Sequence, residues 1–526
     1  MSGDDTARAF VLGFDGVPWD RIERWTDAGH LPNFARMREE GASGPLESTV
    51  PATTAVAWPA ITTGVNADKH GVYAFQNLAA NYTHRMHTST DLRAPALWHL
   101  LSPAVTGNVP LTYPAEDIDG AVVTGMMTPR MDAGFTHPPE LAEAVRTRIP
   151  DYQIGLDWSQ YGDRPGEFVA ELRSLVESRR ALMELLMERA DWRLFFFVYT
   201  APDRLQHLVW DDDVLLQHYR QLDDILGDAM AYADERGADL YVVSDHGFGP
   251  IEKFVSANRV LEAEGYLTRR QQSGTRGALA GLGITKESVL SALGRVGITD
   301  QAILEYVPHS LADRIASQIP GEHVLYDVSY AETKAFIHGP GNLYVNDADR
   351  FDEGVVESGA VPAVKRELRT VLEQVTDPET GRPALDVYDG DDLFDDDQSP
   401  DLVVRGKAGY EVGTSLTEDV FVETGAKAAS HRPTGIFLAR GPNVEHGVEI
   451  EGATAVDVAP TVLHGASAAV PRNADGSVLH DVFAARTAPG RGAVSRRDYA
   501  SRAPRTAVDE DFSDVEDRLR GLGYME

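Results

Sequence analysis

The sequence of 526 residues contains no cysteine. This absence excludes disulfide bonds, thiolate metal ligands and a cysteine nucleophile. No segment approaches the ~18 uninterrupted apolar residues of a membrane-spanning helix. The N-terminal sequence MSGDDTARAF also lacks a basic region that leads into an apolar stretch of signal-peptide length. We therefore expect a soluble cytoplasmic protein that has no membrane partner.

Positive charge is scarce in this chain. Lys and Arg number 48 against 82 Asp and Glu, the formal net charge is −34, and only seven residues are lysines. Such an excess of negative charge repels nucleic-acid backbones and acidic membranes, which argues against general nucleic-acid binding. The composition resembles that of proteins from high-salt cytoplasms, where a Debye length of about 3 Å or less screens self-repulsion. We expect folding and activity to require molar salt, so both should be lost on dialysis into dilute buffer.

The hydrophobic residues, which make up 43% of the chain, form short runs such as AFVLGF, RLFFFVYT, DLYVVS and GIFLA. Runs that are apolar at nearly every position are typical of parallel strands buried on both faces of a sheet. Amphipathic helical patterns lie between the runs, for example GEFVAELRSLVESRRALMELLMERA before the strand RLFFFVYT. This alternation predicts an α/β fold with a mostly parallel central sheet and helices on both faces.

The domain organisation is read from changes in composition along the chain. We predict one discontinuous α/β catalytic domain that comprises residues 1–255 and 323–485. Residues 256–322 are rich in helical pattern and dotted with Gly and Arg, which predicts a helical insertion and a candidate cap over the site. Residues 486–526 have weak periodicity and form a C-terminal tail that wraps the surface or is partly disordered.

Two candidate functional residues lie in the first part of the chain. Asp15 follows the run AFVLGF, at the strand end where open α/β sheets form their binding crevices. An Asp in that place more often forms a turn or caps a helix. Thr54 precedes the helical pattern AVAWPAITTG, so its hydroxyl would lie at a helix N-terminus, which favours a bound phosphate. The alternative is that Thr53 or Thr54 only caps that helix.

Three further groups of candidates, five residues in all, lie close to the ends of later strands. Asp203 and His207 stand four residues apart after RLFFFVYT, and on a helix this spacing puts both on one face, within reach of one cation. Asp245 and His246 follow DLYVVS, and His431 shortly precedes the strand GIFLA. The alternatives are an N-cap Asp with an unrelated His, a His held in a tight loop, and a His that binds nothing.

The order of these residues, Asp, Thr, Asp-x3-His, Asp-His and His, resembles the alkaline phosphatase superfamily. Within that superfamily the chain looks like the type I phosphodiesterase/nucleotide pyrophosphatase family. The resemblance runs from Asp15 to about residue 255 and resumes from about 323 to 485. It implies an alkaline phosphatase-like sandwich fold.

The resemblance also implies the roles of the candidate residues. It assigns one divalent cation to Asp203, His207 and His431 and a second to Asp15, Asp245 and His246, with Thr54 touching the second. The metals in this family are typically zinc, and mixed His and carboxylate ligands favour Zn²⁺ or Mn²⁺ over Mg²⁺. The implied nucleophile is the hydroxyl of Thr54, which forms a covalent phospho-threonine.

Local motifs fix the register of the resemblance and show one departure. The TG-x5-HG pattern that begins at Thr63 places the nucleophile at Thr54 rather than Thr53, and Trp58 stands where many prokaryotic members have a Trp. Animal members hold a phosphate oxygen with an Asn soon after the HG pair, but Phe75 occupies that position here. Asn77, two residues later, is the remaining candidate for substrate binding.

The function implied is that of a two-metal phosphoester hydrolase of the phosphodiesterase or nucleotide pyrophosphatase type. Its partner would be a small phosphoester, for example a nucleotide. The alternatives are a phosphomonoesterase or a phosphotransferase of the same fold, and then a non-catalytic, metal-stabilised binding protein. Sulfatases need a Cys or Ser in a C/S-x-P-x-R context, which is absent, and alkaline phosphatases proper use Ser with a nearby Arg.

Overall fold

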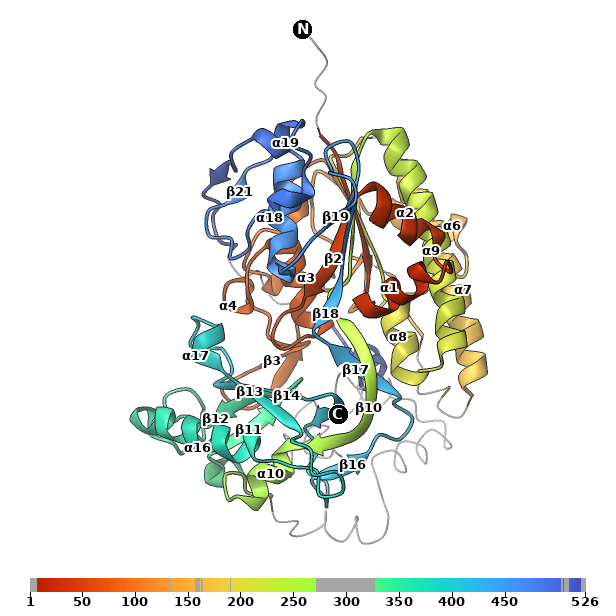
Figure 1. Cartoon of the computed structure of the whole chain (residues 1–526). Coiled ribbons are helices and arrows are strands. Elements are labelled where there is room, and N and C mark those ends of the chain that lie inside the picture. The colour runs from red at the N-terminus through yellow and green to blue at the C-terminus, as the bar shows by residue number, and fades with distance from the viewer. Residues whose placement is uncertain are drawn as a thin grey trace.

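A ten-stranded sheet forms the centre of the larger of two lobes (Figure 1). The computed structural model describes residues 7–132, 134–156, 161, 164–189, 191–270, 327–502, 505 and 510–521. In spatial order the strands are β19 (Val448–Glu449), β2 (Ala42–Glu47), β18 (Thr434–Arg440), β9 (Asp239–Val243), β1 (Ala9–Phe14), β8 (Leu194–Tyr199), β5 (Ala104–Val109), β6 (Gly120–Thr124) and β7 (Thr136–His137), with β20 (Ala453–Thr454) beside β2.

The middle of this sheet is parallel. Strand β1 lies between β9 and β8, and both neighbours run in the same direction as β1. Strands β5 and β6 continue the parallel arrangement beyond β8, whereas β18 pairs antiparallel with both β9 and β2. The carboxyl ends of β1, β8 and β9 therefore meet at one edge of the sheet. The predicted, mostly parallel central sheet is confirmed.

Both faces of the sheet are buried, which explains why its strands are apolar at nearly every position. Along β1, Phe10, Leu12 and Phe14 belong to the hydrophobic core on one face, whereas Ala9 and Val11 belong to the core on the other. This is the alternation that a strand requires. Each face is therefore available for a layer of helices.

Helices cover the two faces unequally (Figure 1). The core on one face includes residues of α1 (Trp19–Asp27), α2 (Pro32–Glu40), α6 (Leu141–Arg148), α7 (Pro165–Met187), α8 (Ala201–Leu208) and α9 (Asp212–Arg236). The core on the other face includes residues of α3 (Thr54–Thr63), α5 (Leu97–Leu100) and α18 (Val458–Gly465). The ends of α9 follow local chemistry, because the Asp211 side chain accepts from the first-turn amides and Gly237 adopts φ 61° at the C-cap. The prediction of helices on both faces is confirmed.

A smaller lobe contains two further sheets and its own core. Its first sheet consists of β15 (Gly409–Gly413), β10 (Gly247–Ser256), β16 (Phe421–Glu423) and β17 (Ala429–Arg432), and its second of β11 (Ala335–His338), β12 (Asn342–Val345), β14 (Leu402–Gly406) and β13 (Leu385–Asp389). The helices α10 (Ala257–Ala263) and α16 (Val361–Glu373) pack in the same core. The predicted insertion, 256–322, begins here with α10, but its residues 271–322 lie outside the described part, so the division into domains stays a prediction.

Strand β10 connects the two lobes. It starts directly after His246, pairs with β17 over residues 247–250, and then pairs with β15 and β16 in the smaller lobe. In Figure 1 it runs as one curved strand from the central sheet towards α10. The first sheet of the smaller lobe is thereby joined to the end of the central sheet at which β9 terminates.

The described part of the C-terminal tail lies on the larger lobe. Strand β22 (Arg496–Arg497) pairs with β21 (Val470–Pro471), and Arg502 forms an ion pair of 2.6 Å with the buried Glu116. Farther along, Val515 and Leu519 of α20 (Ser513–Gly521) are buried in a core of the larger lobe. These tail residues therefore pack on the larger lobe.

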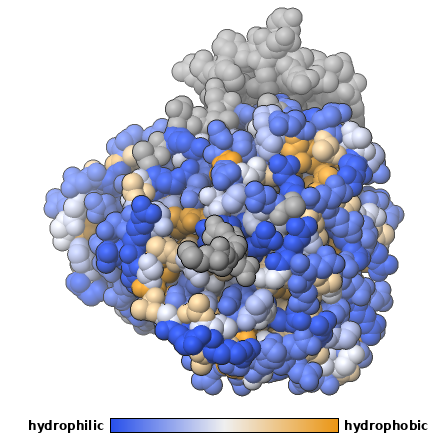
Figure 2. Space-filling view, turned by 90° about the horizontal axis from the view of Figure 1, so that it is seen from above, coloured by the Kyte–Doolittle hydropathy of each residue, from blue (hydrophilic) through white to orange (hydrophobic). Residues whose placement is uncertain are grey.

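The surface is hydrophilic over most of the face that Figure 2 shows, where hydrophobic residues occur in small separate groups. Val355 is the one large hydrophobic side chain that is markedly exposed among the described residues. No helix in the described ranges is both long and apolar enough to cross a membrane.

Candidate metal centre

Three polar side chains meet where β1 and β9 end. Asp15 directly follows β1, and Asp245 and His246 lie between β9 and β10. Because β1 and β9 are adjacent and parallel, their polar end residues lie side by side. His246 Nε2 lies 3.6 Å from Asp15 Oδ1 and 3.3 Å from Asp245 Oδ2. We call Asp15, Asp245 and His246 the strand-end set.

The loop after β1 is fitted closely to its neighbours. The Gly16 N–H donates to Asp245 Oδ1 at 3.1 Å, which ties the two strand ends together. Gly16 has φ +72°, and a Cβ placed on it would lie 3.0 Å from the Asp203 Cα. Only glycine accepts both this conformation and this close approach.

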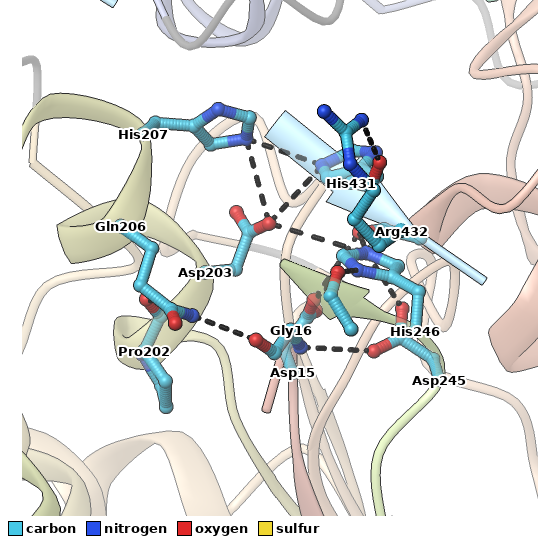
Figure 3. Close-up of polar contacts among 12 residues, drawn as sticks. Asp15, Gly16, Pro202, Asp203, Gln206, His207, Asp245, His246, His431 and Arg432 are labelled. Atoms are coloured by element: carbon cyan, nitrogen blue, oxygen red, sulfur yellow. Dashed lines mark hydrogen bonds and ion pairs between the residues drawn. The ribbon is translucent and has the colours of Figure 1, made fainter. Parts of the chain in front are cut away.

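A second group of three candidate ligands comes from a helix and a strand. Helix α8 follows β8, and on it Asp203 and His207 lie one turn apart, with 3.4 Å between Oδ1 and Nε2. His431 is contributed by β17, which reaches the site because it pairs with β10. Its Nε2 lies 3.3 Å from the same Asp203 oxygen. We call Asp203, His207 and His431 the helix–strand set (Figure 3).

The two sets are adjacent and each fits a cation. Within each set, one ligand atom from every residue lies within 4.8 Å of the others. The imidazole of His246 faces both sets, because its Nε2 is also 4.0 Å from Asp203 Oδ1. Three carboxylates and three imidazoles, five of the six side chains buried, are the donor types that Zn²⁺ and Mn²⁺ prefer.

The carboxylates of the centre crowd one another in a buried place. Burial raises the pKa of Asp15 well above its usual range, and the neighbouring Asp245 adds to the rise. Burial raises the pKa of Asp245 in the same way, and Asp203 adds to it. Burial acts to raise the pKa of Asp203 also, but the imidazoles of His207 and His431 outweigh it and bring that pKa well below its usual range. A bound cation would remove the repulsion that these carboxylates otherwise feel.

The histidines are held in the form that binds metals. Burial lowers the pKa of His207 and His431, which favours neutral imidazoles. His246 Nδ1 lies 3.0 Å from the carbonyl oxygen of Gly247, which can only accept a hydrogen bond. Nδ1 therefore carries the proton, and the Nε2 lone pair is directed to the centre.

Thr54 is the first residue of α3, and its side chain turns towards the strand-end set. Its hydroxyl donates to Asp15 Oδ1 at 3.3 Å and lies 3.2 Å from His246 Nε2. Thr53 is the N-cap residue by backbone conformation, but its side chain makes no capping hydrogen bond. Thr53 therefore does not cap α3 through its hydroxyl, which was one form of the alternative interpretation.

Trp58 supports the centre in a way that the sequence did not reveal. It lies four residues after Thr54 on α3, and its Nε1 donates to Asp15 Oδ2 at 3.1 Å. The close fit of its ring depends on Gly13 in β1, because a Cβ there would lie 2.3 Å from the ring. The i, i+4 spacing from Thr54 was a usable signal, since it puts both side chains on one face of the helix.

A cavity opens beside the helix–strand set, between the two lobes. Its volume is about 150 Å³. Thr53 and Phe75 line it from the larger lobe, and His431 lines it from β17. His338 and Tyr410 line it from the smaller lobe. His338 lacks the strand-end sequence pattern that the other candidate residues share. The cavity is formed by segments that lie far apart in the sequence, so no local motif predicts it.

The predicted substrate contact at Asn77 is not brought to this cavity. Asn77 lies exposed on β3 (Gln76–Leu78), whereas its neighbours Phe75 and Gln76 line the cavity. The structure therefore unites the candidate ligands with Thr54 and leaves Asn77 outside.

Comparisons with known proteins identify the family and the fold of this chain. A model of the type I phosphodiesterase/nucleotide pyrophosphatase family matches residues 9–433, a range that includes Thr54 and both sets. No curated protein matches the sequence significantly. Inactive murine ectonucleotide pyrophosphatase/phosphodiesterase 5 in complex with AMP is similar in structure, with 14% identity, a TM-score of 0.51, and coverage of 91% of this chain and 100% of that chain.

A bacterial enzyme has the same fold. Phosphonoacetate hydrolase from Sinorhizobium meliloti, in complex with phosphonoformate, aligns with a TM-score of 0.55 and 14% identity, covering 88% of this chain and 96% of that chain. These likenesses confirm the predicted alkaline phosphatase-like fold.

Proposed function

This chain belongs to the type I phosphodiesterase/nucleotide pyrophosphatase family of phosphoester hydrolases, and from that premise we propose that Thr54 is its nucleophile and that two divalent cations occupy the strand-end and helix–strand sets. The observation that carries the proposal is the position of the Thr54 hydroxyl, which lies 3.3 Å from Asp15 Oδ1 and 3.2 Å from His246 Nε2. A helix N-terminus directly beneath it favours a bound phosphate.

The chemistry has two halves, and both use Thr54. The Thr54 hydroxyl gives up its proton as its oxygen bonds to phosphorus. The bond from phosphorus to the leaving alcohol or nucleotide breaks, so that the leaving oxygen takes the electron pair and a proton. Water then attacks the phosphorus of phospho-Thr54, restores the hydroxyl and releases the phosphoryl product. Divalent cations in the two sets would lower the pKa of the Thr54 hydroxyl and would neutralise part of the negative charge of the phosphate. The first-turn N–H groups of α3 hold the phosphate oxygens.

The proposed substrates are phosphodiesters and nucleotide pyrophosphates. The cavity beside His431 would receive the leaving part of the substrate, and Phe75 offers it an aromatic wall. The similar murine structure contains AMP, which supports nucleotides as the first compounds to test. A phosphomonoesterase or phosphotransferase reaction is the alternative. We propose zinc as the metal, with manganese as the alternative, and the cytoplasmic, high-salt setting stays a prediction.

The decisive experiment compares two neighbouring threonines. We expect Thr54→Ala to fold, to bind its cations and to lose ~10³-fold or more of kcat, since removal of a covalent nucleophile has effects of that order. Thr53→Ala is the matched control and should keep most of the activity. The measurements are steady-state hydrolysis of bis-p-nitrophenyl phosphate, thermal melts and metal content.

The possible outcomes separate the mechanisms clearly. An active Thr54→Ala beside an inactive Thr53→Ala would move the nucleophile by one residue. Two fully active variants would overturn the covalent mechanism. A parallel assay with p-nitrophenyl phosphate and nucleotides distinguishes a diesterase from a monoesterase.

A further inference from the structure

We propose that Gln206 is a positioning residue that sets the spacing between the strand-end set and the helix–strand set. The inference rests on the proposed function, because it assumes that both sets hold cations. Gln206 lies on α8 next to His207, and it is fully buried. It is not itself among the grouped ligands.

A single nitrogen of Gln206 contacts the backbone beside one ligand of each set. Its Nε2 donates to the Gly16 carbonyl oxygen at 2.6 Å and to the Pro202 carbonyl oxygen at 3.1 Å (Figure 3). Gly16 directly follows Asp15, and Pro202 directly precedes Asp203. The amide therefore bridges the loop after β1 and the start of α8.

The orientation of this amide is fixed from a third element. The hydroxyl of the buried Tyr219, on α9, donates to Gln206 Oε1 at 3.1 Å. The Tyr219 ring is held in turn by an edge contact with Trp25, at 4.8 Å between ring centroids. Since the oxygen is occupied by a donor, the nitrogen must face the two carbonyls. Both amide hydrogens and the amide oxygen are thus used.

The Gly16 peptide carries this connection to the far side of the centre. Its carbonyl accepts from Gln206, and its N–H donates to Asp245 Oδ1 at 3.1 Å. Gly16 also packs against the Asp203 backbone with no side chain between them. Displacement of Gln206 would therefore move Asp245 and Asp203 relative to each other.

The spacing of the sets matters because two-metal phosphoryl chemistry uses ions about 3.5–4 Å apart. A misplacement of about 1 Å by a residue remote from the chemistry can reduce a rate ~100-fold. A side chain without donors at position 206 would remove both hydrogen bonds and leave the charge of the centre unchanged. The two sets would then change their spacing while every candidate ligand remained present.

The test uses the full chain loaded with Mn²⁺, whose spin–spin coupling reports the distance between two ions. We expect wild type to bind two Mn²⁺ with a coupled electron paramagnetic resonance spectrum. Gln206→Leu should still bind two Mn²⁺, but with a changed or lost coupling, and its kcat should fall at least ~10-fold with little change in KM. Tyr219→Phe removes the hydrogen bond to Gln206 Oε1 but leaves the Gln206 amide in place. It should show a smaller change of the same kind.

Controls and outcomes separate this proposal from the proposed function. Gln217→Ala, on the exposed side of α9, should leave the spectrum and kcat within about threefold of wild type. An unchanged spectrum and rate in Gln206→Leu would overturn the inference, and so would a wild type that binds a single ion. Should Gln206→Leu fail to fold, Tyr219→Phe decides by the same two readouts. Coupled ions in a wild type that hydrolyses no phosphoester would refute the proposed function alone.

Discussion

The two ligand sets are built in different ways. The strand-end set comes from the ends of two neighbouring strands of one sheet, and each of its side chains is at most 1% exposed. The helix–strand set needs α8 and also β17, a strand of the smaller lobe's sheet. Its outer member, His431, has a side chain that is 12% exposed and borders the cavity.

The two sets therefore differ in how far their geometry depends on the smaller lobe. The strand-end set is fixed by the central sheet, whose backbone hydrogen bonds resist local opening. The helix–strand set is completed only when β10 and β17 pair. We therefore expect the strand-end set to hold its cation more firmly, and the helix–strand set to exchange its cation first.

Removal of one ligand from each set is the strongest test of this difference. We expect Asp245→Ala and His431→Ala each to lower kcat/KM by at least ~100-fold, because in the proposed mechanism both cations act on the transition state. His431→Ala should retain the cation beside Thr54, whereas Asp245→Ala should lose it and also free the Gly16 N–H. The measurements are metal content per chain and phosphodiester hydrolysis. Equal metal loss in the two variants would contradict the comparison.

Graded removal of metal from the wild type should divide the loss of activity into steps. We expect a chelator to release cations in two phases, with activity lost in the first, and Zn²⁺ or Mn²⁺ to restore it. The first phase should be missing in His431→Ala, which identifies its site. Release in one cooperative phase would show that the sets do not differ in access. Fewer than about one cation per chain in active enzyme would rule out two metals.

The smallest expected effect concerns support of the strand-end set. Trp58→Phe removes the hydrogen bond to Asp15 Oδ2, and such contacts typically change metal affinity or activity by about 10-fold or more. The control is Trp98→Phe, since Trp98 is buried in the same core and packs against Phe196. Zinc affinity and kcat/KM should fall in the first variant alone. Equal losses would mean that the Trp58 ring acts only through packing.

Much of the centre could be predicted from the sequence because its residues follow recognisable strands. Asp15, Asp245 and His246 directly follow apolar runs, and parallel neighbours bring such ends together. Asp203 and His207 show the helical i, i+4 spacing. Their placement agrees with the prediction, while their roles as ligands stay a proposal.

The remaining features depend on contacts between distant segments. The local signal of His431 is only its place shortly before the strand GIFLA. Its position in the centre is set by the pairing of β17 with β10, which residue spacing does not encode. Asn77 is predicted from its distance to the HG pair, by comparison with the position of an Asn in animal members of the family. In the structure it is an exposed residue of β3. Gln206 resembles any helical glutamine until the loop after β1 is placed beside it.

Strand β10 has a consequence for protein engineering. It begins beside His246, holds the strand of His431 and continues into the smaller lobe, where it pairs with β15, and residues of both β15 and β17 line the cavity. A chimaera that borrows the smaller lobe of a relative to change specificity should therefore retain residues 247–250 and 429–432 from the parent. Crossover points inside those segments would separate a metal ligand from its scaffold, whereas crossovers after residue 256 and before residue 429 would not.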